Sequence, residues 1–432
     1  MSFPRYESYK DSGVEWLGEV PEHWEILPCR AFVDEQTAKN DDGNNEDYLS
    51  LMANTGIIPY EEKGDIGNKK PEDLTKCKLV SRGDLVINSM NYGIGSYGLS
   101  DLNGICSPVY IVLRPRLNRI ESRYAFRIFE NREFQTYAQS FGNGILAHRA
   151  AINWDILKVV GVGLPPKEEQ VSILNFLDSE TAKIDSLIAE QQRLIELLKE
   201  NRRAVISHAI RPQSGEKTTK LGHLIDLKAG YSFQSEQFSQ DEEGMRLLRG
   251  INVGVGACRW DETVYWTGVV DHKIMEFSLA KDDIVLGMDR PWISSGTRVA
   301  QISKEDLPCL LVQRVARIRA RSGQSQFFIR LLLISNEFKS YLEADLTGVS
   351  VPHISPEQIC SFPARVLPQS QQVQIAMKTE QEFLKLDTLM NEAQTAITLL
   401  QERRTALISA AVTGKIDVRG LVSDKPKVEH AA

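Results

Sequence analysis

The sequence repeats itself once, and this repeat constrains the fold more than any other feature. LLKENRRAVISHAI at Leu197–Ile210 aligns with LLQERRTALISAAV at Leu399–Val412, an offset of 202 residues, and eight of the fourteen positions are identical. The same offset pairs Lys183–Ile188 with Lys385–Met390, and Gln170 with Gln372. Solenoid repeats have periods of about 20–50 residues, so this interval is too long for them. The repeat predicts one unit duplicated once, with pseudo-twofold internal symmetry.

Each copy ends in a long stretch with helical periodicity, near residues 167–210 and 369–412, where apolar residues recur at spacings of three and four. At 1.5 Å per residue, each helix would span roughly 60 Å. An apolar stripe of this length must be buried, and each copy offers the other a partner. We therefore predict an antiparallel coiled coil; alternatively, each helix packs only on its neighbouring domain. The expected packing residues are Ile184, Leu187, Ile188, Leu194, Leu198, Val205, Leu386, Leu389, Met390, Ile397, Leu400 and Leu407.

The segments before the helices contain short apolar runs separated by Gly, Asn, Asp and Pro, which is typical of mixed α/β domains. They share landmarks, since Arg82–Ile87 resembles Lys281–Leu286 and Tyr48–Leu51 resembles Arg246–Arg249. The predicted class is α+β, with two mixed α/β domains alternating with two long helices. The expected segments are an N-terminal segment with the first domain (1–163), a helix (164–212), the second domain (213–366), a helix (367–414) and a C-terminal tail (415–432).

Composition indicates an ordinary globular protein, with 42% hydrophobic and 25% charged residues. The sequence has no stretch typical of a membrane span or a signal peptide, and its six cysteines form no Cys-x-x-Cys pair. We therefore expect a cytoplasmic protein with free thiols and no membrane partner. The formal charge of −7 is not typical of a dedicated nucleic-acid binder. It does not exclude one, because the local field depends on where the charges lie.

Motifs for catalysis are missing. Gly93–Gly98 reads Gly-x-Gly-x-x-Gly, but a turn-rich stretch follows where a nucleotide-binding fingerprint needs a helix. A plain turn or an approach to DNA backbone is therefore favoured. The sequence contains neither the Asn/Asp-Pro-Pro-Tyr/Phe loop of adenine methyltransferases nor a Gly-x-Ser-x-Gly elbow, and its seven histidines form no ligand cluster. We expect no catalytic residue, metal or cofactor in this chain.

Polar and charged side chains lie in or beside the Gly-rich loops, where binding residues concentrate, and these are the candidates for contact if the chain binds DNA. Arg and Lys side chains can hydrogen-bond to the edge of guanine, and Asn and Gln side chains to the edge of adenine. The alternative for each candidate is an ordinary surface charge or a residue that forms a turn. Arg290 and Trp292 stand out because they flank a proline in a polar loop. The candidates are Lys69, Lys70, Asn88, Asn91, Tyr92, His148, Arg149, Arg249, Asn252, Arg290, Trp292, Arg298, Arg314 and His353.

Lys10, Trp16 and Trp24 are expected to be architectural instead. The two tryptophans are separated by Pro21, and their large side chains suit anchors of an N-terminal segment on the fold or on a partner.

Three segments resemble the specificity subunits of type I restriction–modification systems. They are YKDSGVEWLGEVPEHW at 9–24, LPPKEEQ at 164–170 leading into the first long helix, and AVTGKID at 411–417. The resemblance extends in order over nearly the whole chain. One departure is that residues 211–224 do not repeat the Asp-Ser-Gly-x-Glu-Trp stretch that many relatives carry before the second domain.

The resemblance implies a non-catalytic subunit with two target-recognition domains, each reading one half of a bipartite, asymmetric site in double-stranded DNA. The helices would set the gap between the halves. It also implies two modification subunits, which use S-adenosylmethionine to methylate adenine N6, and restriction subunits that use ATP and Mg²⁺. Two other functions remain open from the sequence: a coiled-coil protein-interaction scaffold, and a self-sufficient DNA methyltransferase.

Overall fold

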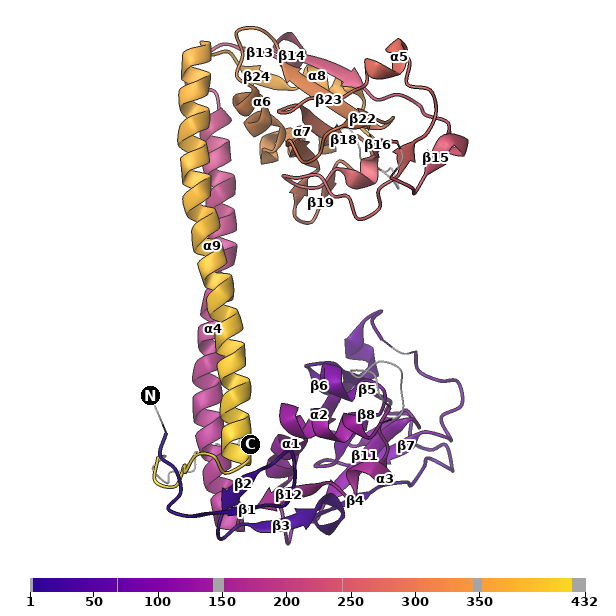
Figure 1. Ribbon diagram of the computed structural model, residues 1–432, viewed down its shortest axis with the longest axis vertical. Coiled ribbons are helices and arrows are strands. Elements are labelled where there is room, and N and C mark those ends of the chain that lie inside the picture. Colours follow the sequence, from indigo (N-terminus) through magenta and orange to yellow (C-terminus); the bar gives the residue numbers. More distant parts are fainter. Residues whose placement is uncertain (1–2, 68, 143–150, 243, 345–351, 422–432) are drawn as a thin grey trace. The chain divides into compact units, whose positions relative to one another are not determined.

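The computed structural model describes residues 3–67, 69–142, 151–242, 244–344 and 352–421 (Figure 1). The chain forms two compact units. The first contains residues 1–191 and 395–432, and the second contains residues 192–394. Each unit therefore holds one globular part and about half of each long helix. No helix within the described ranges is both long and apolar enough to cross a membrane.

The two predicted long helices are confirmed as α4 (Lys167–Ile210) and α9 (Gln369–Val412), each of 44 residues. Their buried and half-buried positions follow spacings of alternately four and three, the seven-residue repeat of coiled coils. These seam positions in α4 are Leu177, Thr181, Ile184, Ile188, Gln191, Ile195, Leu198, Arg202, Val205 and Ala209. In α9 they fall 202 residues later, at Thr379, Phe383, Leu386, Met390, Ala393, Ile397, Leu400, Arg404, Leu407 and Ala411.

Three of the expected packing residues are not in this seam. Leu187, Leu194 and Leu389 are 45%, 40% and 46% exposed. From Ile184 the seam advances by four residues to Ile188, so Leu187 lies outside it. The expectation was wrong here because residues three and four apart both lie on one side of a helix. Leu187 is three residues after Ile184, but the seam continues with the residue four positions after it.

The helices run antiparallel within each unit. In the first unit, Arg404 Nε lies 3.0 Å from Asp185 Oδ1. Farther along, Gly414 packs against Trp24, whose indole N–H donates to Glu169 at the start of α4. In the second unit, the equivalent Arg202 pairs with Asp387. Arg365, just before α9, donates to the carbonyl of Ala209 near the end of α4.

The two globular parts contain the same four-stranded antiparallel sheet, which confirms the predicted mixed α/β class. The first sheet has the order β4-β11-β8-β9, formed by Val33–Glu35, Tyr110–Pro115, Leu85–Asn88 and Tyr97–Leu99. The second has the order β14-β23-β18-β21, formed by Ile225–Ala229, Val315–Ala320, Ile284–Gly287 and Val299–Gln301.

The elements around each sheet also correspond. Both parts add a helix pair after the last sheet strand, a short helix, and a two-stranded ribbon. In the first part these are α1 (Ser122–Glu130), α2 (Arg132–Ser140), α3 (Trp154–Leu157), and β3 (Glu25–Pro28) with β12 (Gly161–Leu164). In the second they are α6 (Gln326–Leu333), α7 (Asn336–Glu343), α8 (Pro356–Ser361), and β13 (Thr218–Lys220) with β24 (Pro363–Arg365).

The remaining strands are short. The first part has β1 (Tyr9–Asp11), β2 (Glu19–Pro21), β5 (Leu49–Met52), β6 (Gly56–Pro59), β7 (Lys78–Val80) and β10 (Gly104–Cys106). The second has β15 (Phe238–Ser239), β16 (Met245–Leu248), β17 (Tyr265–Trp266), β19 (Trp292–Ile293), β20 (Gly296–Thr297) and β22 (Cys309–Leu311), with the short helix α5 (His272–Met275).

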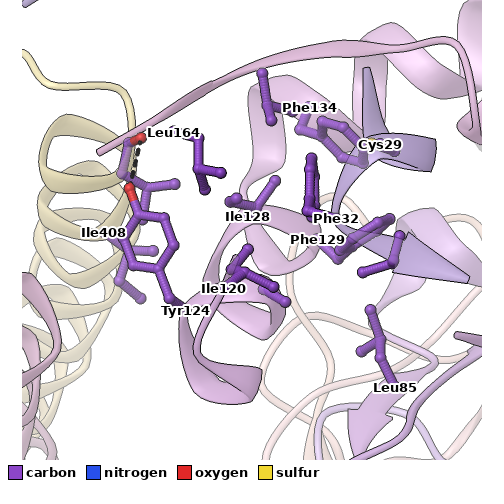
Figure 2. Close-up of a cluster of buried hydrophobic side chains, with 14 of the residues drawn as sticks. Cys29, Phe32, Leu85, Ile120, Tyr124, Ile128, Phe129, Phe134, Leu164 and Ile408 are labelled. Atoms are coloured by element: carbon purple, nitrogen blue, oxygen red, sulfur yellow. Dashed lines mark hydrogen bonds between the residues drawn. The ribbon is translucent and has the colours of Figure 1, made fainter. Parts of the chain in front are cut away.

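Aromatic side chains fill the core of the first unit. Figure 2 shows Phe32, Phe129 and Phe134 packed together, and all three are fully buried. Tyr124 extends this cluster to the helix pair, where its hydroxyl donates to the carbonyl of Val412 at 3.5 Å. The globular part and the helices of this unit therefore share one apolar core.

A buried glutamine locks each long helix to its globular part. Gln170 accepts a hydrogen bond from the backbone N–H of Glu121 at 2.9 Å, just before α1. Its repeat partner Gln372 accepts from the N–H of Ser325 at 2.8 Å, just before α6. Each amide also donates to a carbonyl ahead of its own helix. Because a buried side-chain amide needs hydrogen-bond partners, these bonds fix the position of the start of each long helix on its globular part.

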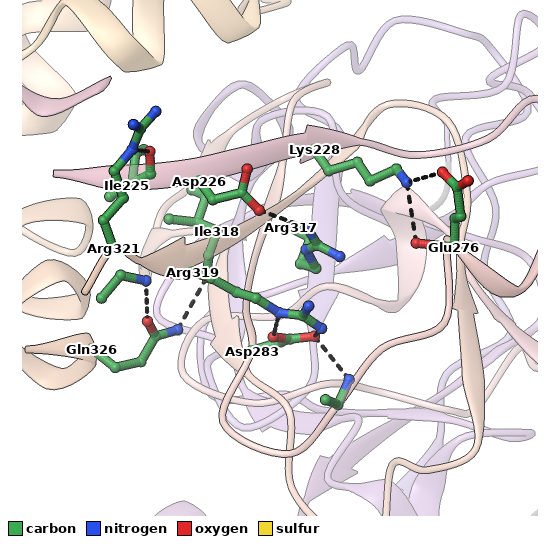
Figure 3. A network of polar contacts seen from close by, with 12 residues as sticks. Ile225, Asp226, Lys228, Glu276, Asp283, Arg317, Ile318, Arg319, Arg321 and Gln326 are labelled. Atoms are coloured by element: carbon green, nitrogen blue, oxygen red, sulfur yellow. Dashed lines mark hydrogen bonds and ion pairs between the residues drawn. The ribbon is translucent and has the colours of Figure 1, made fainter. Parts of the chain in front are cut away.

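A buried aspartate holds the central sheet in each part. Asp84 accepts two bonds of 2.8 Å from Arg114. The equivalent Asp283 binds Arg319 in the same two-pronged way (Figure 3). These two aspartates belong to the landmark shared by Arg82–Ile87 and Lys281–Leu286, so that sequence similarity reports a repeated structural contact.

We expect Asp84→Asn or Asp283→Asn to lower the free energy of unfolding of its own unit by about 1.5–3 kcal/mol, because each removes a buried charged acceptor. Urea unfolding followed by circular dichroism measures the loss. The matched control is Asp34→Asn, whose partner Arg116 forms a solvent-exposed pair and which should cost less than about 1 kcal/mol. Equal losses at buried and exposed sites would contradict this account.

Candidate DNA interface

Each globular part brings two loops together beside its sheet. The first loop pair is residues 53–55 after β5 and 89–96 after β8; the second loop pair is residues 249–259 after β16 and 288–298 after β18. In the first pair the N–H of Asn54 donates to the carbonyl of Gly95 at 2.9 Å. In the second pair the side chain of Arg298 makes the connection. The topology thus repeats while the contact that joins the loops differs.

The Gly-x-Gly-x-x-Gly stretch lies in the first loop pair and is a turn. Gly95 has a φ of +88°, and a Cβ there would lie 2.3 Å from Asn54 Oδ1. A Cβ on Gly98 would lie 2.9 Å from the Cα of Gly56. Strand β9 follows instead of a helix. The glycines therefore allow close approach of two backbone segments, as the turn interpretation predicted.

Two candidates of the first part are corrected by their burial. Tyr92 is fully buried, and its hydroxyl donates to the carbonyl of Phe129 at 2.5 Å. Asn88 is 5% exposed, and its side-chain oxygen accepts from the N–H of Met90. Both expectations of DNA contact are wrong, because these polar groups are already used inside the fold. Burial raises the pKa of the Tyr92 hydroxyl well above its ordinary value, so it stays neutral.

The other candidates of the first part keep some exposure. Lys69 is exposed, Asn91 is half-buried at the start of a turn, and Lys70 donates to the carbonyl of Glu46 at 3.0 Å. Their roles stay predictions. His148 and Arg149 lie outside the described residues.

Two candidates of the second part are also corrected. Asn252 is 1% exposed and donates to the carbonyl of Arg259 at 2.9 Å. Arg298 is 9% exposed, and its guanidinium donates to the carbonyls of Val253, Asp289 and Gly250. Neither side chain is available to DNA. Arg249 is half-buried and donates to the carbonyl of Glu262 at 2.6 Å.

Arg314 and His353 both bind Asp289, the residue just before Arg290. Arg314 Nη1 and His353 Nδ1 lie 2.7 Å and 2.6 Å from the Asp289 carboxylate. Burial alone would raise the pKa of Asp289, but the bonds from Arg314 and His353 hold it below its ordinary value. Arg290 is exposed and has a φ of +44°, a conformation uncommon for arginine. Trp292 packs partly on the core, so its ring is only half available.

Sequence reasoning overlooked Arg259, which lies in the second loop pair and is exposed. It stands in a plain Gly-Ala-Cys-Arg-Trp stretch that carries no recognisable motif. The approach of the two loops brings it close to Arg298, because Arg259 is bound to Asn252 while Arg298 Nε binds the carbonyl of the next residue, Val253.

A cavity of about 960 Å³ lies between the first loop pair and the helices of the first unit. Its charged lining is mostly paired, because Arg404 binds Asp185 and Arg127 binds Glu130. Among the described residues, no group of three His, Cys, Asp or Glu side chains could hold a metal ion.

The N-terminal tryptophans are architectural, as predicted. Trp24 is fully buried and its indole donates to Glu169 Oε1 at 2.9 Å. Trp16 donates to the carbonyl of Gly161 at 3.0 Å. The opening segment thus anchors both the ribbon β3–β12 and the start of α4.

Comparison with known proteins agrees with this architecture. Residues 37–197 match the family model described as "Type I restriction modification DNA specificity domain". The chain is 33% identical over 199 residues to the EcoAI specificity subunit of Escherichia coli, covering 46% of this chain and 33% of that protein. It is 24% identical over 444 residues to the MjaVIII specificity subunit of Methanocaldococcus jannaschii, covering 98% of this chain and 99% of that protein. The chain thus spans a third of the first relative and nearly all of the second.

Solved structures share the fold. A chain from a type I restriction–modification system superposes with a TM-score of 0.71 at 15% identity, covering 91% of this chain and 98% of that one. The HsdS subunit of Thermoanaerobacter tengcongensis superposes with a TM-score of 0.52 at 16% identity, with the same coverage. The chain therefore shares the fold of these solved structures over most of its length, and its residues 37–197 match the specificity domain of type I restriction–modification systems.

Proposed function

We propose that this chain is the DNA-recognition subunit of a type I restriction–modification complex, and that each globular part reads one half of a bipartite, asymmetric target. The observation that carries the proposal is the repeated pair of loops. Both parts present loops after equivalent strands, yet the side chains in them differ. Two domains that share a fold but differ in their loop side chains can read different DNA sequences, because sequence specificity comes from side-chain contacts to base edges.

The long helices would hold the two halves of the target at a fixed gap. Each is continuous over 44 residues. A paired helix is stiffer than a loop of equal length, so it keeps a constant separation between the parts that it joins. This function explains why the helices match closely in the repeat while the globular parts diverge.

The chemistry would belong to partners: two modification subunits that use S-adenosylmethionine, and restriction subunits that use ATP and Mg²⁺. Equivalent exposed apolar residues support two copies of one partner. The first unit exposes Val171, Leu187 and Leu399 by 44%, 45% and 59%, and the second exposes their repeat equivalents Val373, Leu389 and Leu197 by 41%, 46% and 52%. Exposed apolar side chains at equivalent positions of the repeat would suit two equivalent docking surfaces.

We expect Leu187→Glu with Leu399→Glu to reduce the number of bound modification subunits from two to one, because only one of two equivalent surfaces is altered. The mass of the purified complex, measured by native mass spectrometry, gives the count. Glu190→Gln on the same helix is the control and should leave two copies bound. Retention of both copies, or loss of both, would argue against two equivalent docking surfaces.

Sequencing of DNA for adenine methylation tests the proposed function directly. Cells that express this chain with its modification subunit are compared with cells that lack this chain. We expect a new mark at a split motif, with two short half-sites and a fixed gap. If the complex assembles and no such mark appears, the proposal fails and a protein-interaction scaffold becomes the better account.

A further inference from the structure

Two exposed arginines, one from each loop of the second pair, have guanidinium groups without a hydrogen-bond or ion-pair partner among the residues that the structure describes. Arg259 follows β16 and Arg290 follows β18. The backbone of Arg259 is fixed, because its N–H donates to the carbonyl of Asn252 at 2.8 Å and its carbonyl accepts from the Asn252 amide. The backbone N–H of Arg290 donates to the carbonyl of Pro352 at 2.8 Å. Both free side chains therefore start from fixed positions.

Gly254 makes room for the side chain of Arg259. A Cβ at position 254 would lie 3.3 Å from Arg259 Nε and 2.6 Å from the carbonyl oxygen of Ala257. The Arg259 side chain consequently lies across the backbone of its own loop, with its guanidinium still exposed.

Arg298 ties the two loops together. Its Nε donates to the carbonyl of Val253 at 2.9 Å in one loop, and its Nη1 donates to the carbonyl of Asp289 at 3.0 Å in the other. Nη2 binds the carbonyl of Gly250. A buried guanidinium is tolerated only when its donors are used, so this bridging geometry is strongly fixed. Together with the backbone bond from Gly256 N–H to the carbonyl of Val299, this side chain holds the two loops at a defined spacing.

The charges around Arg298 favour an anion. Burial lowers the pKa of Arg298, and Arg259 and Arg290 act in the same direction, while Asp289 opposes them. The Asp289 carboxylate is already bound by Arg314 and His353. Arg259, Arg290 and Arg298 thus place three positive charges in this loop pair, although the net charge of the chain is −7. A free guanidinium presents a planar fork of donors that matches guanine N7 and O6.

We propose that Arg259 and Arg290 contact base edges in the half-site read by the second globular part, and that Arg298 is a positioning residue that fixes their separation. This assignment rests on the proposed function of DNA recognition. It also gives a reason for two different half-sites, because the first loop pair is joined by its backbone at Asn54 and Gly95 rather than by an arginine.

The test uses the full chain assembled with its modification subunits and a set of duplexes in which each base pair of both half-sites is substituted in turn. Arg259→Gln and Arg290→Gln should each reduce discrimination roughly 10- to 100-fold at one or two base pairs of a single half-site. The other half-site should be unchanged. The control is Lys281→Gln, an exposed cation at the opposite end of β18, which should alter neither half.

Arg298 is tested by Arg298→Lys, which keeps the charge but cannot make all three bonds. We expect a changed base preference at the base pairs that Arg259→Gln and Arg290→Gln affect, with the salt dependence of binding preserved. A purely structural role would lower the melting temperature and weaken binding to all sequences equally. An unchanged base preference in Arg298→Lys would overturn the positioning role.

The outcomes separate the two proposals. If the wild-type complex shows no split target, DNA recognition itself fails, and this assignment fails with it. If the wild-type complex binds a split target while Arg259→Gln and Arg290→Gln leave both half-sites intact, only the assignment is overturned. Uniform loss of affinity with a weaker salt dependence would show phosphate contact, which also overturns base reading.

Discussion

Seven residues inserted into both long helices, after Gln191 in α4 and after Ala393 in α9, should lengthen the gap in the DNA target and leave both half-sites unchanged. These two positions are equivalent in the repeat and both lie in the seam. A seven-residue insertion preserves the alternation of four and three, so the helices can still pair. It lengthens each helix by about 10 Å, which corresponds to about three base pairs of DNA.

Methylation sequencing measures the new gap. The control places the same seven residues after Gly215, in the exposed turn between α4 and β13, where the gap should not change. A new half-site sequence with an unaltered gap would contradict the spacing function of the helices, as would an equal gap change in the control.

Replacing Trp24 by alanine should destabilise the first unit by about 3–5 kcal/mol. The side chain is fully buried, and its ring lies against Gly163 and Gly414, so its loss opens a cavity between the ribbon and the end of α9. It also removes one of the donors to the buried Glu169 carboxylate, which binds Tyr6 at 2.7 Å and His23 at 2.7 Å as well. Cavity and lost hydrogen bond act in the same direction.

Urea unfolding followed by circular dichroism gives the loss in free energy. Trp24→Phe is the matched variant, since it fills part of the cavity but lacks the indole N–H donor. It should cost about 1–3 kcal/mol. A loss below about 1 kcal/mol for Trp24→Ala would show that the opening segment does not anchor the fold.

The sequence predicted well those features that are recorded in neighbouring residues. The bounds of α4 and α9 follow from a helical period and from the proline and glycine residues that flank it. The repeat predicted two similar domains, and the shared landmark around Asp84 and Asp283 corresponds to the same buried contact in each. Both copies of the repeat make this contact, and losing one partner of a buried charge pair would be costly in each.

The sequence was less reliable where two spacings compete. Leu187 and Leu389 fit a helical stripe, yet they lie outside the seam, which continues through Ile188 and Met390. Hydrophobicity alone does not distinguish a leucine that faces the paired helix from one left exposed on the helix surface. The periodicity of the sequence predicts that each helix has an apolar side. Which apolar residues are buried there depends on how the partner helix packs against it.

What the sequence determined by itself is the duplicated architecture, because the helical period, the repeat and the anchoring motifs are written in residues close together in the chain. What only the tertiary structure decided is which polar side chains face outward. Arg290 and Arg298 are eight residues apart in one loop, yet the first is exposed and the second is buried against the carbonyls of Gly250 and Val253. Those carbonyls lie 48 and 45 residues earlier in the chain, and their approach depends on how the strands pair rather than on any local pattern.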